Sequence, residues 1–425
     1  MPNATLMERR DRALGAGAPL FYRQPLHIVR GEGVHLFDAH GRRYVDMYNN
    51  VPCVGHAHPR VVEAMAKQQA SLNVHSRYLH EGIVAFAERL AALHGPAIES
   101  VVFSCSGTEA NEIALRMARF ATGQRGILCT DATYHGNNDL VGSLSGLGGG
   151  EVKHPDVAAF AFPQTYRPIA LGLTGEALAD AYLESLEGAI QRLEASGAGV
   201  AALIVCSIFA NEGLPDVPSS FMARAAERVR AAGGLVIADE VQAGYGRCGQ
   251  WWGYGVTGFT PDIVVTGKPM GAGLPLSATA ASRALVETFR RNAHYFNTFA
   301  SSPLQAAVGM AVLDVIQEEG LIENAATVGP ALKTALQAGK HRWGAIGDIR
   351  GVGLFIGVEM VDANGRPDQD GAVEVVNRLK DMGFLTSNAG AHGNVVKIRP
   401  PLVFSQAEAA AFLTAFDAVV DGLRG

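Results

Sequence analysis

One lysine, Lys268, constrains this chain most, because it directly follows an apolar run that is typical of a buried strand. The run is residues 262–267, Asp-Ile-Val-Val-Thr-Gly, and Gly271 and Gly273 follow the lysine. Apolar β-branched residues indicate a strand that is covered on both faces, as in a parallel sheet. We expect a lysine there to be desolvated, with a lowered pKa and an amine that can form a Schiff base. A lone lysine is more often an ordinary surface residue, so other segments must decide.

A second segment, residues 101–119, joins a short apolar strand to a helix through Ser106, Gly107 and Thr108. Alanine and leucine recur at helical spacing after these residues, which places all three at the N-terminus of the helix. The free backbone N–H groups and the helix dipole make such an N-terminus an anion site. A plain capped helix is the alternative, because many helices begin in this way.

A third apolar run, residues 234–238, ends in two carboxylates, Asp239 and Glu240. Ligands of open α/β sheets bind beyond the carboxyl ends of the strands. A carboxylate there can pair with the pyridine nitrogen of pyridoxal 5′-phosphate (PLP), which makes the ring an electron sink. A metal-binding or structural pair is the alternative. Tyr134, followed by His135, could stack on such a ring or belong to the core. Together, the segments indicate a PLP site.

Composition and charge limit the partners of the chain. Its 425 residues allow more than one domain, and a net charge of −6 argues against binding of nucleic acid. The five cysteines include no Cys-x-x-Cys pair, which favours reduced thiols over disulfides or zinc. There is no apolar run of about 18 residues, and residues 1–12 lack the apolar core of a secretory signal. We therefore expect a cytoplasmic protein without a metal or a membrane partner. The glycine-rich segment 142–150 predicts a loop over the site.

From about Phe21 to the last helix, the order of these segments resembles the class III aminotransferases, a PLP-dependent family of fold type I. The resemblance includes Gly-His-Ala-His-Pro at residues 55–59 and Asn-Thr-Phe at residues 297–299. It implies an α/β fold, with a large domain around a mainly parallel seven-stranded sheet and a smaller α+β domain from the N-terminal segment and the C-terminal region. The expected divisions are an N-terminal arm with a small antiparallel unit (1–58), the large PLP-binding domain (59–311) and the C-terminal small domain (312–425).

The resemblance also implies a role for each matching residue. Lys268 is the implied catalytic residue, which carries the cofactor as a Schiff base. The other implied cofactor contacts are Asp239 at the ring nitrogen, Val241 and Tyr134 on the ring faces with His135 in the same set, Gln242 at the ring hydroxyl, and Ser106, Gly107 and Thr108 at the phosphate. Thr298 is implied to reach the phosphate of the neighbouring subunit, which would make the enzyme a homodimer with active sites at the subunit interface.

Departures from the family pattern favour a lyase over a transaminase. Transaminases of this family typically place an arginine before a Pro-Pro-Leu element to bind a substrate carboxylate, and a glutamate elsewhere neutralises that arginine. Here Lys397 and Ser207 stand at the matching positions, and lysine does not replace arginine at a bidentate carboxylate site. The transaminase interpretation stays open if Arg399, on the same strand face as Lys397, takes the carboxylate, or if Glu212 replaces the glutamate.

A narrower resemblance points the same way. Residues 44–51, 73–80 and 347–357 are similar to the phospho-lyase branch of class III, which acts on phosphoethanolamine or phosphohydroxylysine. It implies β-elimination, with release of ammonia and an aldehyde, from a small phosphorylated or phosphonate-bearing amine. Loss of hydroxide from hydroxy-aminoethylphosphonate is a variant of this reaction. The candidate substrate contacts are Tyr22, Asn50, Arg77, Lys397 and Arg399, of which Arg77 and Lys397 are cations suited to a phosphate or phosphonate.

Two other functions remain as alternatives. An ω-aminotransferase would pass the amino group to a keto acid or an aldehyde. A PLP-fold binding protein without catalysis is disfavoured, because Lys268, Asp239 and Gln242 are retained together.

Overall fold

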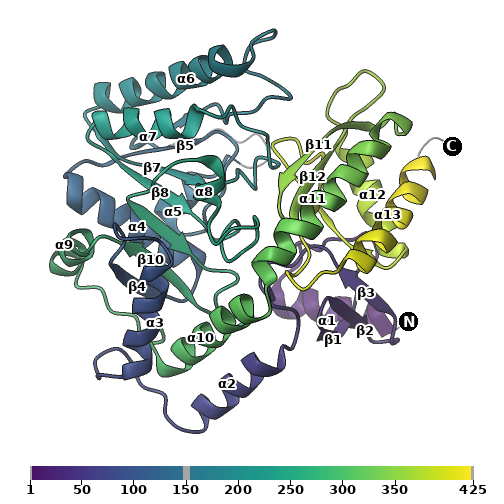
Figure 1. The fold of residues 1–425 in the computed structure, drawn as a ribbon, viewed down its shortest axis with the longest axis horizontal. Coiled ribbons are helices and arrows are strands. Elements are labelled where there is room, and N and C mark those ends of the chain that lie inside the picture. The colour runs from purple at the N-terminus through teal and green to yellow at the C-terminus, as the bar shows by residue number, and fades with distance from the viewer. Residues whose placement is uncertain (1, 147–153, 423–425) are drawn as a thin grey trace.

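The computed structural model describes residues 2–146 and 154–422. A seven-stranded sheet forms the larger part, on the left of Figure 1. Its strands, in spatial order, are β4 (Ser100–Ser104), β10 (Ser277–Ala281), β9 (Ile263–Thr266), β8 (Leu235–Asp239), β7 (Val200–Cys206), β5 (Gly126–Thr130) and β6 (Val157–Phe160). Only β10 runs against its neighbours. The predicted mainly parallel seven-stranded sheet is confirmed.

Helices cover both faces of this sheet (Figure 1). In β7 every residue is buried, as expected for a strand between two helical layers. Leu203 and Val205 pack with α6 (Gly175–Ala195) and α7 (Phe221–Ala231). Ala202 and Ile204 point the other way, into a cluster with α4 (Gly107–Thr122) and α9 (Arg283–Ala293). Each large apolar side chain buried in this way contributes about 1.5–3 kcal/mol.

Two four-stranded sheets form the smaller part of the molecule. In pairing order, the strands of the first sheet are β1 (Ile28–Glu32), β2 (His35–Asp38), β3 (Arg43–Asp46) and β13 (Phe384–Leu385). Those of the second sheet are β11 (Ile346–Val352), β12 (Phe355–Met360), β15 (Val395–Ile398) and β14 (Ser387–Ala389). β13 runs parallel to β3, with Phe384 opposite Val45. The N-terminal segment and the C-terminal region thus share one sheet, which confirms the smaller α+β part.

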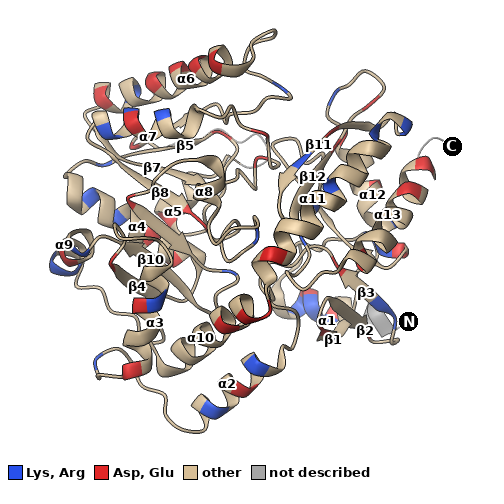
Figure 2. Cartoon of the chain, in the orientation of Figure 1, with Lys and Arg blue, Asp and Glu red and all other residues tan. Residues whose placement is uncertain are grey.

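The remaining helices connect and cover these sheets. They are α1 (Pro2–Leu14), α2 (Pro59–Gln69), α3 (Glu81–Ala92), α5 (Asp139–Gly142), α8 (Gly253–Thr257), α10 (Pro303–Glu318), α11 (Leu321–Gly339), the 3-10 helix η2 (Lys340–Arg342), α12 (Gln369–Asp381) and α13 (Gln406–Asp421). Acidic side chains predominate along α6 and basic ones along the neighbouring α7 (Figure 2). Arg224 of α7, for example, pairs with Glu176 and Asp180 of α6. Such exposed pairs contribute about 0–1 kcal/mol each.

The structure differs from the sequence-based expectations mainly at its N-terminus. The expected N-terminal arm begins with a helix, α1, because residues 4–13 contain mostly good helix formers. The predicted domain boundary at residue 312 lies within the continuous helix α10, so the three-part division stays a prediction. The predicted loop at 142–150 lies partly outside the described residues. Within the described residues, no helix is both long and apolar enough to cross a membrane.

Candidate active site

A cavity of about 220 Å³ lies where β7, β8 and β9 end and α4 begins. Its lining residues are Ser106, Gly107, Thr108, Tyr134, His135, Gly136, Cys206, Asn211, Asp239, Val241, Gln242 and Lys268. The structure thus brings together nine of the ten predicted cofactor contacts, all except Thr298. This is the edge of an α/β sheet at which ligands bind.

Lys268 projects into this cavity from the segment after β9. More than a third of its surface is accessible, because it faces the cavity, while protein atoms enclose it on the other sides. Burial lowers the pKa of the Lys268 amine, and the positive charge of Arg399 lowers it further. Asp239 acts in the opposite direction but is the weaker influence. A larger fraction of this amine is therefore neutral, and able to act as a nucleophile or base, than in an ordinary lysine.

Asp239, the last residue of β8, is held in place by three donors. His135 Nδ1 lies 2.6 Å from its Oδ2, Asn111 Nδ2 donates to the same oxygen at 2.9 Å, and the Val241 N–H donates to Oδ1 at 3.0 Å. Burial alone would raise the pKa of this carboxyl, but the hydrogen bond from His135 and the other donors hold it below its usual value. His135 Nε2 also contacts Thr133 Oγ1 at 2.9 Å. Asp239 is therefore a fixed negative charge at the cavity wall.

The N-terminus of α4 forms the anion-binding part of the cavity. The Ser106 side chain accepts from the Glu109 N–H at 3.2 Å, as an N-cap does. Within the described residues, the backbone N–H groups of Gly107 and Thr108 have no such partner. Gly136 has a φ of 152°, and a Cβ there would lie 2.6 Å from Thr108 Oγ1. Only glycine lets the Tyr134 loop approach this helix terminus so closely.

Gln242 connects the cavity to a group of cations. Its Nε2 donates to Asn211 Oδ1 at 3.1 Å, and its Oε1 accepts from Arg399 Nη1 at 2.5 Å. Arg399 Nε also donates to the Tyr48 carbonyl at 2.9 Å. Arg399 is 3% exposed and pairs with no carboxylate among the described residues. One side of the cavity is thus backed by a buried, uncompensated guanidinium.

Lys397, on β15, is a second buried cation in the same place. Lys397 is 7% exposed, and within the described part of the chain its side-chain amine makes no hydrogen bond or ion pair. Burial lowers the pKa of Lys397 well below its usual value, and the charges of Arg399 and Lys268 act in the same direction. A buried cation without a partner is costly. An anion that bound there would favour the charged form of Lys397.

Among the described residues, no glutamate takes the place of the one that neutralises the carboxylate-binding arginine in transaminases. Ser207, at the matching position, is fully buried and neutral. Glu212 is buried as well, but its Oε1 accepts from Thr130 Oγ1 at 2.5 Å. Burial raises the pKa of Glu212, and its carboxyl is turned toward the end of β5. It neutralises neither Lys397 nor Arg399.

Two predicted substrate contacts, Asn50 and Tyr22, are outside the cavity lining and already have protein partners. Asn50 is buried, with Nδ2 donating to the Gln242 carbonyl at 3.2 Å and Oδ1 accepting from Arg247 Nε at 3.0 Å. The Tyr22 hydroxyl donates to the Thr386 carbonyl at 2.9 Å. These bonds position the cavity wall, and direct contact with a substrate stays a prediction for both residues.

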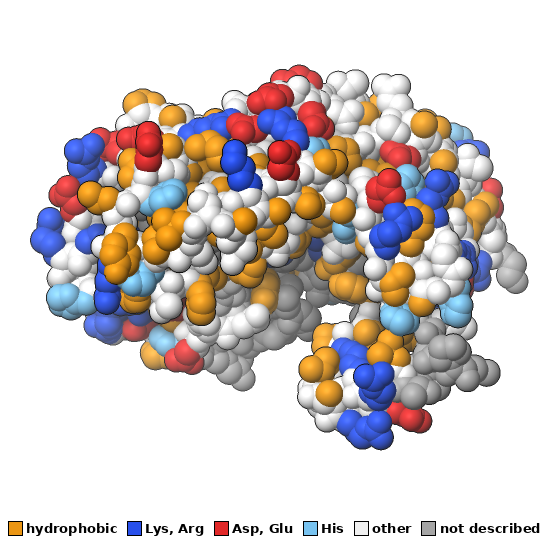
Figure 3. Space-filling view, turned by 90° about the horizontal axis from the view of Figure 1, so that it is seen from below, with side chains coloured by type: hydrophobic (Ala, Val, Ile, Leu, Met, Phe, Trp, Pro, Cys, Tyr) orange, Lys and Arg blue, Asp and Glu red, His pale blue; other side chains and the backbone are white. Residues whose placement is uncertain are grey.

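The other two predicted residues, Arg77 and Thr298, lie away from the cavity of their own chain. Both are exposed, and the Arg77 guanidinium carbon lies 4.0 Å from the centroid of the Phe296 ring. They therefore belong to one surface, made by the segment between α2 and α3 and the segment after α9. The lower side of the molecule, near α2 and α10, carries hydrophobic side chains among polar ones (Figure 3).

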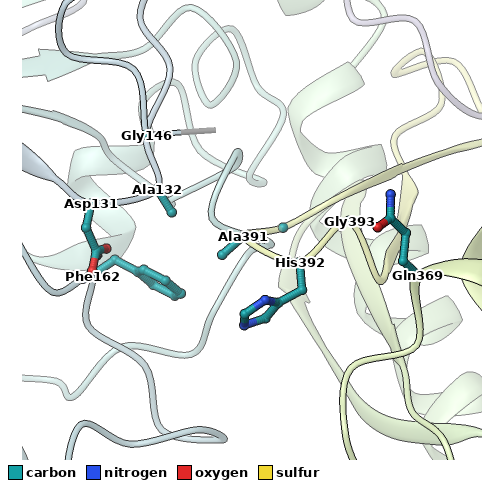
Figure 4. Close-up of a pocket in the computed structure, with 9 residues that line it drawn as sticks. Asp131, Ala132, Gly146, Phe162, Gln369, Ala391, His392 and Gly393 are labelled. Carbon is teal, nitrogen blue, oxygen red and sulfur yellow. Dashed lines mark hydrogen bonds between the residues drawn. The ribbon is translucent and has the colours of Figure 1, made fainter. Parts of the chain in front are cut away.

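A larger cavity of about 600 Å³ lies beside the site and has a different lining. Asp131 and Phe162, which lie just after β5 and β6, and His392, in the turn before β15, line this cavity (Figure 4). It adjoins the Asn211 loop, because the Gly390 N–H donates to the Asn211 carbonyl at 3.1 Å. Lys268 does not line it, so we place the chemistry in the smaller cavity.

Sequence reasoning missed three residues of the site: Asn211, Cys206 and Tyr48. Cys206 ends β7, so its place could have been inferred from the strand-end rule that located Asp239. Asn211 lies in a loop, and Tyr48 lies about 350 residues from the cations that it contacts. No local pattern signals either of these two.

The fold and the cavity define a PLP-dependent enzyme of fold type I. The family model described as aminotransferase class-III matches residues 21–420. A Drosophila melanogaster protein named alanine–glyoxylate aminotransferase 2-like is 38% identical, over 96% of this chain and 85% of the relative. The Caenorhabditis elegans ethanolamine-phosphate phospho-lyase homolog 1 is 34% identical, over 98% of this chain and 93% of the relative. A solved Arthrobacter phospholyase in complex with phosphoethanolamine is 39% identical, with a TM-score of 0.94 over 98% of this chain and 99% of that one. The chain belongs to the class III aminotransferase family.

Members of this family use PLP, and the cavity fits that cofactor. The free N–H groups at the start of α4 suit its phosphate. Across the cavity, the ionised carboxylate of Asp239 suits a protonated ring nitrogen. Lys268 supplies the amine, and Val241 and Tyr134 line the space between these groups. These residues would hold the cofactor.

Proposed function

We propose that the protein is a PLP-dependent lyase for a small phosphorylated or phosphonate-bearing amine. It would eliminate a β-substituent, phosphate or hydroxide, and release ammonia. Phosphoethanolamine and hydroxy-aminoethylphosphonate are the substrates that we would test first. The Arthrobacter phospholyase and the nematode phospho-lyase homologue, both similar over nearly the whole chain, support a lyase.

The buried and unpaired amine of Lys397 is the observation that carries this proposal. With Arg399 beside it, the site holds two cationic side chains, and no carboxylate of the described residues pairs with either. A doubly charged phosphate or phosphonate balances two such charges better than a singly charged carboxylate does. The transaminase switch, in which a glutamate neutralises the arginine when no carboxylate is bound, lacks its glutamate here.

The residues of the site are suited to elimination. PLP, when bound, makes the proton on the amine-bearing carbon acidic. The neutral Lys268 amine takes this proton, since it lies in the same cavity. The bond from the β-carbon to the leaving oxygen then breaks, and its electron pair departs with phosphate, whose charge Lys397 and Arg399 stabilise. The unsaturated amine that remains hydrolyses. Phosphoethanolamine and water thus give acetaldehyde, ammonia and phosphate.

A product assay without any keto acid tests this function. Purified holoenzyme should release ammonia over many turnovers from phosphoethanolamine, phosphohydroxylysine or hydroxy-aminoethylphosphonate. Free phosphate in equal amount identifies phosphate as the leaving group, and ammonia without phosphate identifies hydroxide. Lys268→Ala should lose turnover. If none of the three amines gave ammonia, the proposal would be wrong.

The alternative is an ω-aminotransferase, which the name of the fruit-fly relative favours. A transaminase would use each cofactor once with an amine donor and then stop until a keto acid was added. A broad panel of amines, followed by absorbance, distinguishes this single turnover from continuous ammonia release.

We also infer a homodimer whose active sites lie at the subunit interface. Thr298 and Arg77 share an exposed surface with Phe296, outside the cavity of their own chain. In the dimer, this surface would supply Thr298 to the phosphate end of the partner's site, and Arg77 to its substrate. The cytoplasm is the proposed location, since all five cysteines are free thiols. Cell fractionation would check it.

A further inference from the structure

The ring of Tyr48 lies close to both buried cations of the site. Lys397 Nζ is 5.5 Å from its centroid, and Arg399 Cζ is 5.1 Å from it. Phe21 packs edge-on against the same ring at 4.6 Å. Both distances to the cations are within the range of cation–π attraction.

The position of Tyr48 is fixed by the backbone around it. The Tyr48 N–H donates to Asp46 Oδ1 at 3.0 Å, and the Tyr48 carbonyl accepts from Arg399 at 2.9 Å. Asp46 is a carboxylate near the cations, but its oxygens are occupied by backbone N–H groups, by Asn49 and by His56. It therefore orders the loop rather than pairing with Lys397.

An aromatic ring and a carboxylate stabilise a buried cation in different ways. A carboxylate would form an ion pair, which an incoming anion would have to break at a cost. The face of a ring attracts the cation without neutralising it. The ring would thus favour the charged forms of Lys397 and Arg399 and leave both free to bind an anion. Phe355 contributes in the same way, 5.1 Å from Arg399 Cζ.

We propose that Tyr48 is a specificity-determining residue: its ring replaces a carboxylate counter-ion and so keeps Lys397 and Arg399 available for a doubly charged phosphate or phosphonate. This inference rests on the proposed function for its substrate class, but it concerns binding alone. A site with an acidic residue in place of the ring would instead form an internal ion pair and favour weakly charged substrates.

Calorimetric titration of the holoenzyme with inorganic phosphate and with acetate tests the proposal. The holoenzyme is needed because the cofactor then fills the anion site at α4. Wild type should prefer phosphate. Tyr48→Phe keeps the ring and should bind phosphate within about twofold of wild type, whereas Tyr48→Leu should bind it about 5- to 30-fold more weakly. Tyr48→Glu should abolish the preference.

A double variant separates the ring effect from general damage. If the ring acts through Lys397, Tyr48→Leu should cost much less affinity in a Lys397→Met background than in wild type. Thermal unfolding and cofactor absorbance confirm that each variant is folded and loaded.

Three results would overturn the assignment: unchanged phosphate affinity in Tyr48→Leu, an equal loss in Tyr48→Phe, or full additivity with Lys397→Met. Wild-type holoenzyme that does not prefer phosphate to acetate would overturn it too. Ring-dependent phosphate binding without ammonia release from any phosphorylated amine would instead reject the lyase function and leave the role of Tyr48 standing.

Discussion

At the scale of single residues, Lys397 links the charge of the site to pH. Burial and the charges of Arg399 and Lys268 all lower the pKa of its amine from the usual 10.5. Lys397 therefore loses its charge at a lower pH than an exposed lysine, and phosphate affinity falls as the pH rises through that lowered value. An arginine stays charged throughout this range. We predict that Lys397→Arg removes this alkaline fall, as measured by phosphate titration of the holoenzyme between about pH 7 and 10.

Wild type and Lys397→Arg must be compared by the shape of their pH profiles, since arginine also changes the geometry of the site. Parallel profiles for wild type and Lys397→Arg would contradict the prediction. They would mean that Lys397 does not titrate in this range.

Burial of His94, which is remote from the site, should make the stability of the protein depend on pH. Its ring stacks on Trp252 at 4.0 Å, its Nε2 is buried without a partner in the described structure, and burial lowers its pKa to about 3. The unfolded chain therefore takes up a proton first, near pH 6.5, so stability is lost as the pH falls from 6.5 toward 3. This costs up to about 2 kcal/mol at pH 5. His94→Phe should lose less thermal stability than wild type between pH 7.5 and pH 5.

Both proteins share every other acid-sensitive group, so the comparison isolates His94. An equal fall in Tm for wild type and His94→Phe would show that the imidazole is not the cause.

The residues of the site were predictable from sequence to different degrees. Lys268 and Asp239 follow apolar strands, and the rule that ligands bind at strand ends applies to both. The pair of Lys397 and Arg399 follows from alternation along one strand. Tyr48 was not predictable, because its meeting with β15 depends on how the N-terminal segment folds over the C-terminal sheet. Asn211 depends on a loop conformation, which sequence patterns do not determine.

At the scale of elements, helix α11 packs very closely against the turn between β11 and β12, and a substitution can test how much stability depends on this contact. A Cβ on Gly329 would lie 2.0 Å from the carbonyl oxygen of Gly353, and a backbone atom cannot move aside at little cost. We predict that Gly329→Ala destabilises the protein by about 1–3 kcal/mol, although alanine favours helices. The change in Tm measures the effect.

Gly188, within α6, is the matched control. A Cβ there would meet only Arg192 Nη1, at 3.7 Å, so Gly188→Ala should stabilise the helix by about 0.5–1 kcal/mol. If both alanine variants raised Tm, the close approach of α11 to Gly353 would not limit stability.

Elements whose pattern is local were predicted well. The apolar run at residues 262–267 contains β9, and the helix predicted to begin at Ser106, Gly107 and Thr108 is α4. The pairing of β13 with β3 joins residues more than 300 positions apart, and the family resemblance implied only that the N-terminal segment and the C-terminal region share a domain. Helix α1 was missed because a short polar segment has no apolar stripe that distinguishes it from a loop.

At the scale of the whole molecule, the proposed dimer predicts that two inactive variants can restore each other. Lys268→Ala removes the amine of its own site but leaves Thr298 intact. Thr298→Glu should place a negative charge at the phosphate of the partner's site and repel it. A mixed dimer then contains one site with both Lys268 and an intact Thr298. Because a mixed dimer has one such site out of two, we expect purified mixed dimers to show about half of wild-type activity.

The mixture can be made by co-expression with two affinity tags, so that only mixed dimers are purified and assayed. Each variant alone should be nearly inactive, and Thr298→Glu alone should lose PLP on dialysis. If Thr298 instead served the site of its own chain, the mixed dimer would have no complete site, because one chain lacks the lysine and the other carries the glutamate. Absence of activity in the purified mixed dimer would therefore reject a site shared between subunits and leave Thr298 without a role at the interface.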